Sequence, residues 1–320
     1  MKSITRAQAT ALLMGGAALG ATASRVQAQA PALETIRVAT FPSENGAEAY
    51  YANDMGFFAK AGIDVTISTT QGDSITASAV TSNAVDIGYV GVGTLAALHA
   101  KGIPMVLVAP ASEYLAPETR GIAAIVLPAN STVRSAKDLN GKIVAVSTIR
   151  TIAEAGVRGW MDQNGGDSST VKFIEVPLVA TNAALNAGRF DAALITEPFL
   201  GEAKKIGRVL AYGYDGVAKH FMIAVWFTTP EYARDHPDLV RRFASVIHDT
   251  AVWANKNPDK SGPILAKYSK MDPAIVAGMA RSRYAERMDT QLMQPIIDVF
   301  AHFNGFKPFP ASEFAVIPAR

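Results

Sequence analysis

Short apolar runs alternate along the chain with segments in which apolar residues recur every three or four positions. The first run, residues 36–40, is typical of a β-strand. The segment after it places Ala47, Tyr51, Met55 and Phe58 on one helical face, and Gly62 ends that helix. The strand–helix cycle continues to about residue 109. This alternation predicts a mainly parallel sheet that is covered by helices on both faces.

The same cycle starts again near residue 121. We predict strands at residues 36–40, 63–68, 85–90, 105–109, 121–127, 142–147, 171–176, 192–196 and 222–227. We predict helices at residues 47–58, 73–83, 94–100, 153–164 and 181–187. Helices dominate after residue 227. The longest begins near Pro237, and the residues on its apolar face are Leu239, Phe243, Ile247, Thr250 and Trp253.

The restart of the cycle predicts two lobes. Lobe I would contain residues 33–120 and 219–320, and lobe II would contain residues 121–218. Ligands of open α/β sheets bind at the carboxyl ends of the strands. We therefore expect an α/β fold with two mainly parallel sheets and an interlobe cleft. The cleft would close on a ligand about the connections near Gly121 and Phe221.

The N-terminal segment has the pattern of a secretory signal peptide. Lys2 and Arg6 precede an uncharged, weakly apolar stretch, and residues 26–28 (VQA) fit the small-x-small pattern of a cleavage site. We predict that residues 1–28 are removed and that the mature protein lies in the periplasm. A retained membrane anchor is the weaker alternative, because the apolar stretch is shorter than the roughly 20 residues of a membrane span.

The charge balance argues against a nucleic-acid partner. The chain has 30 Lys and Arg against 28 Asp and Glu, and removing Lys2, Arg6 and Arg25 leaves 27 bases. The remaining bases form no cluster of the kind that neutralises phosphates. Cysteine is absent, which excludes disulfides, thiolate metal sites and cysteine nucleophiles.

Motifs of catalysis and of cofactor binding are also absent. The chain has no G-x-S-x-G elbow, no phosphate loop ending in G-K-S/T and no H-E-x-x-H. Its five histidines are scattered, with no pair at the spacing of metal ligands. We therefore predict no catalytic residue, no metal and no cofactor, and we interpret the protein as a binder rather than an enzyme.

Four segments, in their order and spacing, resemble the nitrate/sulfonate/taurine-type (SsuA/THI5-like) solute-binding proteins of ABC importers. They are residues 55–65 (MGFFAKAGIDV), 85–88 (VDIG), 135–147 (SAKDLNGKIVAVS) and 188–192 (GRFDA), the last leading to Glu197-Pro198. The resemblance implies a two-lobed type II periplasmic binding protein fold, a small-molecule ligand, a permease partner in the inner membrane and a monomer. The superfamily also contains aminopyrimidine-binding proteins, and fungal pyrimidine synthases that depend on a cysteine-rich motif absent here.

Candidate ligand-binding residues follow the strands, where loops open towards helices. The full set is Thr40, Phe41, Asn45, Gly91, Val92, Gly93, Thr148, Arg150, Thr151, Glu197 and Trp226. Polar groups after the first strand could face a ligand, or Ser43 and Asn45 could merely cap a helix. Glycines near residue 91 would let a ligand approach the backbone, and the resemblance places that loop on the ligand. Phe41 and Trp226 are candidate apolar walls, with burial in the core as the alternative.

In lobe II, residues 147–151 lie between a strand and a helix, where the helix dipole favours an anion. Arg150 adds a forked donor suited to a carboxylate, sulfonate or phosphate, unless it forms a surface ion pair. Glu197 could accept hydrogen bonds from a ligand amine, or could stabilise a helix start.

Together Arg150 and Glu197 would favour a zwitterion such as taurine, or an aminopyrimidine, over a plain anion. If they pair with each other instead, this inference about charge fails. The function that we predict is a periplasmic binding protein of an ABC importer. The alternatives are a ligand-sensing subunit of a membrane receptor and an exported enzyme.

Overall fold

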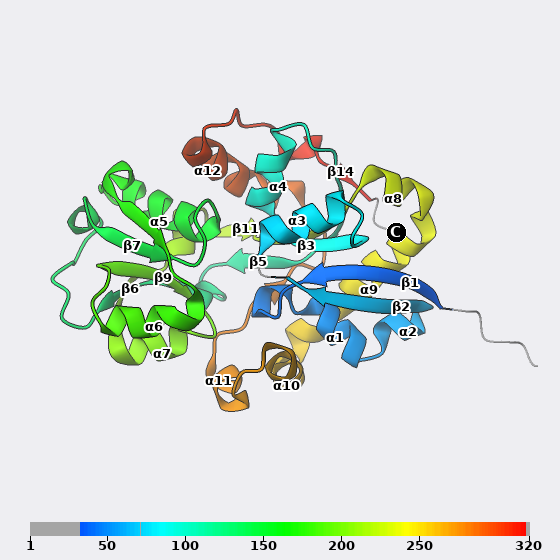
Figure 1. Ribbon diagram of the computed structural model, residues 1–320, viewed down its shortest axis with the longest axis horizontal. Coiled ribbons are helices and arrows are strands. Elements are labelled where there is room, and N and C mark those ends of the chain that lie inside the picture. Colours follow the sequence, from blue (N-terminus) through cyan, green and yellow to red (C-terminus); the bar gives the residue numbers. More distant parts are fainter. Residues whose placement is uncertain (1–32, 71, 318–320) are drawn as a thin grey trace, which may run out of the picture. The chain divides into compact units, whose positions relative to one another are not determined.

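The computed structural model describes residues 33–70 and 72–317. The predicted signal peptide, residues 1–28, lies outside them. From Leu33 onward the chain forms one compact unit. Two larger sheets organise this unit, and Figure 1 shows them side by side, the first at the right and the second at the left.

The first sheet has six strands in the order β14–β4–β12–β3–β1–β2. These strands are β1 (Glu34–Thr40), β2 (Ile63–Thr69), β3 (Ile87–Gly91), β4 (Val106–Pro110), β12 (Ala224–Thr228) and β14 (Ala315–Val316). Val38 of β1 lies opposite Ile87 of β3, and both side chains are fully buried. The chain leaves this sheet after β4 and returns to it with β12 and β14. We call these strands and the helices that pack on them the first lobe.

The second sheet has five strands in the order β10–β6–β9–β7–β8. They are β6 (Ala123–Pro128), β7 (Ile143–Val146), β8 (Lys172–Glu175), β9 (Ala192–Thr196) and β10 (Gly207–Ala211). All five come from one continuous part of the chain. We call this sheet and its helices the second lobe.

Both sheets are mainly parallel, as the sequence predicted, and each contains one strand that runs against the others. β1 is parallel to β2 and β3, β4 to β14, and β7 to β8 and β9. β12 is antiparallel to β3 and β4, and β6 is antiparallel to β9 and β10. The reason lies in the crossings between lobes. A chain that crosses from one lobe enters the next sheet where the other strands end, and so it runs against them.

A third sheet of three short strands, which the sequence did not predict, lies on the crossings. Its order is β11–β5–β13, formed by β11 (His220–Met222), β5 (Ser112–Leu115) and β13 (Arg283–Tyr284). β5 leads out of the first sheet and β11 leads back into it. β13 pairs with β5 from the C-terminal part of the chain. Both crossing segments are therefore held together by backbone hydrogen bonds.

Helices cover the faces of both larger sheets. The α-helices are α1 (Glu48–Asp54), α2 (Phe57–Lys60), α3 (Asp73–Thr81), α4 (Val92–His99), α5 (Ile152–Gln163), α6 (Leu178–Asn186), α7 (Leu200–Ile206), α8 (Pro230–Asp235), α9 (Pro237–Lys256), α10 (Pro258–Ser269), α11 (Pro273–Gly278) and α12 (Gln294–Asn304). The short 3-10 helices are η1 (Glu44–Gly46), η2 (Arg120–Ile122), η3 (Lys137–Leu139), η4 (Ser168–Thr170), η5 (Gly213–Gly216), η6 (Thr290–Leu292) and η7 (Ala311–Glu313).

Most of the predicted helices are present, and one of them is divided into two. The predicted helix 47–58 is split into α1 and α2 at Gly56, whose φ of +69° is the left-handed conformation that favours glycine. The apolar face predicted for the longest helix is confirmed in α9, where Leu239, Phe243, Ile247 and Thr250 are buried.

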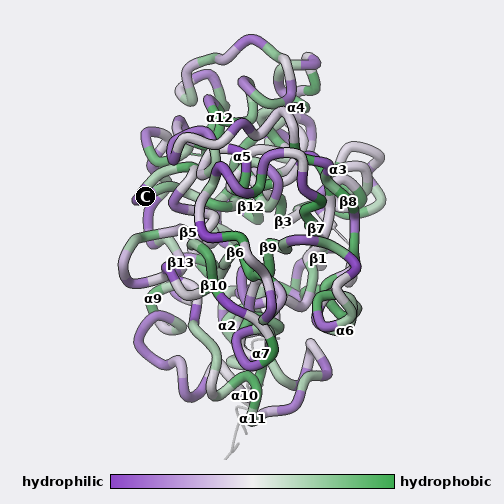
Figure 2. Tube along the Cα trace, turned by 90° about the vertical axis from the view of Figure 1, so that its left-hand side faces the viewer, coloured by the Kyte–Doolittle hydropathy of each residue, from purple (hydrophilic) through white to green (hydrophobic). Residues whose placement is uncertain are grey.

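Apolar residues concentrate in the strands of the sheets. Figure 2 shows hydrophobic positions along β6 and β9, with hydrophilic positions in many of the surrounding loops. All five residues of β12 are buried, as are the first four of β9. Within the described residues, no helix combines the length and apolarity that a membrane crossing requires.

Candidate ligand-binding site

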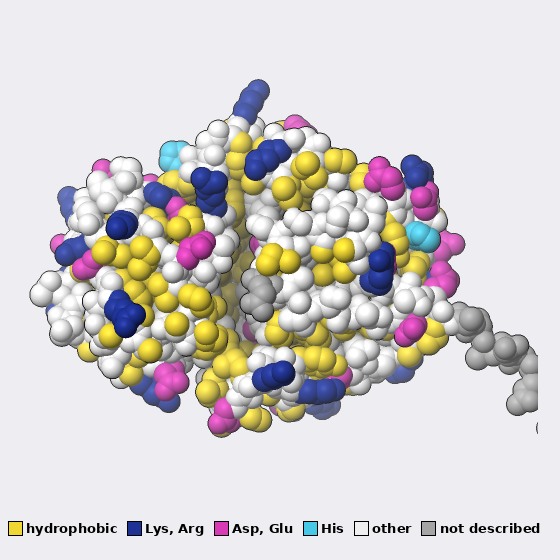
Figure 3. All heavy atoms as spheres, viewed as in Figure 1, with side chains coloured by type: hydrophobic (Ala, Val, Ile, Leu, Met, Phe, Trp, Pro, Cys, Tyr) yellow, Lys and Arg dark blue, Asp and Glu magenta, His cyan; other side chains and the backbone are white. Residues whose placement is uncertain are grey.

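A cavity of about 730 Å³ lies between the two lobes. Ser74 of α3 and Thr94 of α4 line it from the first lobe, and Thr148 and Arg150 line it from the second. Phe303 of α12 contributes an aromatic wall. Figure 3 shows a groove between the elements of the two lobes in the same view as Figure 1. The cavity has the size of a small-molecule site.

The N-terminal end of α5 forms the second-lobe wall of this cavity. Its N-cap residue, Thr151, donates its hydroxyl to the carbonyl oxygen of Thr148 at 2.8 Å, so no side chain caps the helix. Glu154 accepts the backbone N–H of Arg150 at 2.8 Å and thereby holds the loop. The positive end of the helix dipole therefore faces the cavity and favours an anionic group there.

Two arginines on this wall have different surroundings. Arg158 donates to Glu154 at 2.7 Å and lies over the ring of Phe173, with its guanidinium carbon 4.6 Å from the ring centre. Arg150 is exposed, has a φ of +61°, and forms no ion pair with any residue in 33–70 or 72–317. Its guanidinium is therefore the group on this wall that is free to receive an anion.

Asp73, the first residue of α3, was not predicted from the sequence. Its Oδ2 accepts the backbone N–H of Gly91 at 3.1 Å and the hydroxyl of Thr94 at 3.0 Å. Burial raises the pKa of Asp73, and the two hydrogen bonds offset part of this increase. Asp73 comes just after a strand and opens a helix. The rule that selected residues 40–45 and 147–151 could therefore have found it.

Several predicted residues of the first lobe support the cavity rather than line it. Thr40 is buried and donates its hydroxyl to the carbonyl oxygen of Gly46 at 2.8 Å. Val92 and Gly93 are buried in α4, where a Cβ on Gly93 would lie 2.2 Å from Cζ of Phe300. Gly91 acts through its N–H, which holds Asp73. The glycine at position 93 thus permits α4 to pack closely on α12.

The two predicted aromatic walls belong to one aromatic cluster of the first lobe, in which both pack on Tyr89. Trp226 is fully buried and donates its indole N–H to Oε2 of Glu48 at 2.9 Å. Phe41 is half-buried and packs edge-to-face on Tyr89, with ring centres 5.0 Å apart. Trp226 therefore occupies the core, which was the alternative for that residue.

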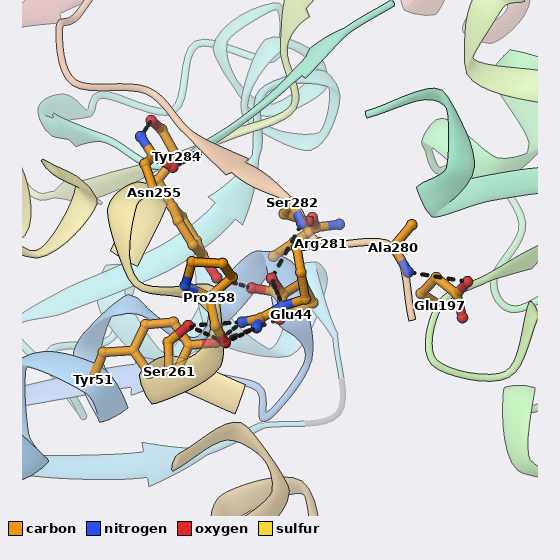
Figure 4. Close-up of polar contacts among 11 residues, drawn as sticks. Glu44, Tyr51, Glu197, Asn255, Pro258, Ser261, Ala280, Arg281, Ser282 and Tyr284 are labelled. Carbon is orange, nitrogen blue, oxygen red and sulfur yellow. Dashed lines mark hydrogen bonds and ion pairs between the residues drawn. The ribbon is translucent and has the colours of Figure 1, made fainter. Parts of the chain in front are cut away.

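Glu197 is hydrogen-bonded to two backbone N–H groups and forms no ion pair with Arg150. Its Oε2 accepts the N–H of Gly201 near the start of α7 at 3.1 Å, and its Oε1 accepts the N–H of Ala280 at 3.4 Å (Figure 4). Burial raises its pKa, and these two donors oppose the increase. Glu197 does not line the cavity. The structure therefore does not bring Arg150 and Glu197 together, either as an ion pair or as facing walls of this cavity.

Residues 279–284, here called the interlobe strap, also connect to the first lobe. Arg281 donates to buried Glu44 at 2.8 Å and to Tyr51 and Ser261 at 3.1 and 2.9 Å (Figure 4). Burial raises the pKa of Glu44, and the Arg281 guanidinium opposes this effect. The next residue, Ser282, donates its hydroxyl to Oδ1 of Asn45 at 2.5 Å. Asn45 therefore anchors the strap through its side-chain oxygen, and it does not line the cavity.

The sequence of residues 43–261 matches the model of the NMT1/THI5-like family, which covers more than half of the chain. The chain belongs to the NMT1/THI5-like family. Proteins similar in sequence include a binding protein of Brucella abortus, 26% identical over 234 residues, which span 72% of this chain and 70% of that one. The taurine-binding periplasmic protein of Escherichia coli is 27% identical over 188 residues, or 57% of this chain and 54% of that one.

Solved structures place this NMT1/THI5-like chain in the fold of the periplasmic binding proteins. The aliphatic sulphonate binding protein SsuA of Escherichia coli superposes with a TM-score of 0.72, at 16% identity over 90% of this chain and 93% of that one. The desulfurization enzyme DSZB superposes with a TM-score of 0.66, at 16% identity over 88% of this chain and 96% of that one. The predicted two-lobed fold is confirmed, and it is a fold that serves both binding proteins and an enzyme.

Proposed function

We propose that this protein is the substrate-binding component of an ABC importer. In this role it captures a small organic solute with an anionic group in the interlobe cavity and delivers it to a membrane permease. The observation that carries the proposal is the second-lobe wall of the cavity. The unpaired guanidinium of Arg150 and the uncapped N-terminus of α5 both lie on this wall.

The size of the cavity favours an organic solute over an inorganic ion. A nitrate or bicarbonate ion would occupy only a small part of about 730 Å³. A sulfonate or carboxylate with an attached carbon chain could contact Arg150 and also reach Thr94 and Phe303 on the other walls. The relatives named for taurine and for aliphatic sulphonates bind solutes of this kind.

We also propose that the protein works in the periplasm as a monomer beside an inner-membrane permease. Lys2, Arg6 and the site at Ala28 support export and cleavage. N-terminal sequencing of protein from the periplasmic fraction should start at Gln29. Recovery of the intact chain in the membrane fraction would contradict this part of the proposal.

Binding fits the cavity better than catalysis does. The cavity walls carry hydroxyls from Ser74, Thr94, Thr148 and Thr151, but no histidine lines them to activate a hydroxyl. We therefore prefer transport to the enzyme role that DSZB exemplifies. A receptor subunit would use the same cavity, and transporter genes beside its own gene would favour the importer.

Calorimetric titration of Arg150→Ala tests the proposed anion site. A charge-assisted hydrogen bond contributes roughly 1.5–3 kcal/mol, so the variant should bind taurine and ethanesulfonate roughly 10- to 150-fold more weakly. The matched control is Arg189→Ala, which removes an exposed arginine on the second lobe away from the cavity. Unchanged affinity in Arg150→Ala would contradict the proposed site.

A further inference from the structure

The first lobe contributes a cationic side chain to the interlobe cavity. Four of the residues that line it from this lobe are Thr94, Ala97, Leu98 and Lys101. Their spacing of three, one and three positions places them on one face of α4 and of the turn that follows it. At 1.5 Å per residue, this face extends about 10 Å along the helix. The wall therefore has a hydroxyl at one end and an ammonium group at the other.

Lys101 has no acidic partner. Its side chain is exposed, and its ammonium group forms no ion pair with any residue in 33–70 or 72–317. The guanidinium of Arg150, on the opposite wall, is unpaired among the same residues. The other two charged residues in the described lining, Arg158 and Glu154, neutralise each other across 2.7 Å. The cavity therefore carries two uncompensated positive charges, one from each lobe.

The same cavity also has apolar surface from both lobes. Leu98 and Ile149 line it from α4 and from the loop before α5, and Phe303 and Phe306 line it from the end of α12. The lobes meet beside it, since the guanidinium carbon of Arg158 lies 5.8 Å from the ring centre of Phe303. Figure 3 shows basic side chains on both sides of the upper part of the groove. A ligand that fills this cavity must therefore offer a carbon skeleton as well as charge.

Closure of the cleft is opposed by these like charges unless the ligand neutralises both. Their repulsion increases as the walls approach and water is excluded. A solute with one anionic group that binds Arg150 leaves Lys101 without a counter-ion. A solute with a second anionic group neutralises both cations. It binds the closed arrangement more tightly than the open one, because only there are both walls within reach.

We infer that the substrate carries two anionic groups on a carbon skeleton, as sulfocarboxylates and dicarboxylates do. This inference rests on the proposed function and narrows it. One anionic group binds Arg150 and the N-terminus of α5, and the other binds Lys101. The carbon skeleton packs on Leu98 and Phe303. Without a ligand the two cations keep the lobes apart, and the dianion removes that repulsion.

Matched pairs of solutes that differ only in the second anionic group test this inference. The pairs are para-sulfobenzoate and para-toluenesulfonate, terephthalate and para-toluate, and glutarate and pentanoate. In each pair a methyl group replaces one carboxylate. Calorimetry measures each affinity for the wild type, Lys101→Gln and Lys101→Arg. The matched control is Lys260→Gln, which neutralises an exposed lysine of α10 outside the cavity.

In at least one pair, the wild type, Lys101→Arg and Lys260→Gln should bind the dianion roughly tenfold more tightly than the monoanion. This is the lower end of the range for a charge-assisted hydrogen bond, because Lys101 is exposed. Lys101→Gln should lose the preference and keep the wild-type affinity for the monoanion.

Three results would overturn the inference and leave the proposed function intact. The first is equal binding of the two members of every pair by the wild type. The second is a preference that survives in Lys101→Gln, which would assign Lys101 to the C-terminus of α4 alone. The third is equal weakening of both members in Lys101→Gln, because the two cations would then share one anionic group. If none of the six solutes binds the wild type, the proposed solute class fails and the inference fails with it.

Discussion

Replacing Glu48 with glutamine should make the stability of the protein less sensitive to pH above about 5. Glu48 is fully buried at the start of α1. Its Oε2 accepts the indole N–H of Trp226, and its Oε1 has no partner among the described residues. Burial raises the pKa of Glu48 well above the ordinary value of 4.5, because a single neutral donor cannot replace the water lost by a carboxylate.

The sign of the effect follows from where the proton is held. Above pH 4.5 the unfolded chain loses the Glu48 proton while the folded chain keeps it. Unfolding therefore releases a proton, and this group's contribution to stability, complete below pH 4.5, is lost as the pH rises towards the folded-state pKa. The slope approaches about 1.4 kcal/mol per pH unit in that window. Glutamine does not titrate. The unfolding free energy of Glu48→Gln relative to the wild type should therefore rise by the same amount per pH unit.

Urea unfolding followed by circular dichroism, at intervals between about pH 5 and pH 7, measures the difference in unfolding free energy. All other titrating groups are shared, so their contributions cancel in the difference. The control is Glu231→Gln, which makes the same chemical change at an exposed position. If the wild type and Glu48→Gln lose or gain stability in parallel over this range, Glu48 is not neutral in the folded protein.

Three other changes have expected outcomes. Arg281→Ala leaves Glu44 buried without its cation and should lower the unfolding free energy by roughly 3–5 kcal/mol. The double variant Arg281→Ala, Glu44→Gln should recover part of this lost free energy. Urea denaturation in which the double variant is no more stable than Arg281→Ala would contradict the prediction. Gly93→Ala brings a methyl group against Phe300 and should cost roughly 1–3 kcal/mol by thermal melting, whereas Gly278→Ala, with open space around it, should not. Saturation with a bound solute should reduce the radius of gyration in small-angle scattering, and an unchanged radius would contradict closure of the cleft.

Strands and helices are predicted best from the sequence where the residue pattern of a single segment determines the element. The apolar run at residues 192–196 has the same bounds as β9, because its burial alone specifies a strand. The strands of the third sheet are two to four residues long. Arg283 and Tyr284 of β13 show no periodicity of their own, and their partner strand ends at Leu115. Such pairing depends on tertiary structure, which a local pattern does not contain.

The same distinction applies to the site. The positions of Thr148 and Arg150 on the cavity wall follow from a local motif, a loop that opens a helix. The role of Asp73 depends on Gly91 and Thr94, which lie 18 and 21 residues away. Glu197 meets Ala280, 83 residues along the chain. No spacing rule links such residues, so the sequence could nominate Glu197 but could not show which group it contacts.

The strand order of the first sheet also has a consequence for the sequence of folding events. β4 lies between β12 and β14, so neither of its neighbours exists until the last third of the chain has been made. The second sheet is complete once residue 211 is available. Domains fold as units when their parts are present. The lobe that contains β1, the first strand along the chain, is therefore the last to finish. In an exported protein, the leading half of the chain would thus still lack a complete sheet while it crosses the membrane.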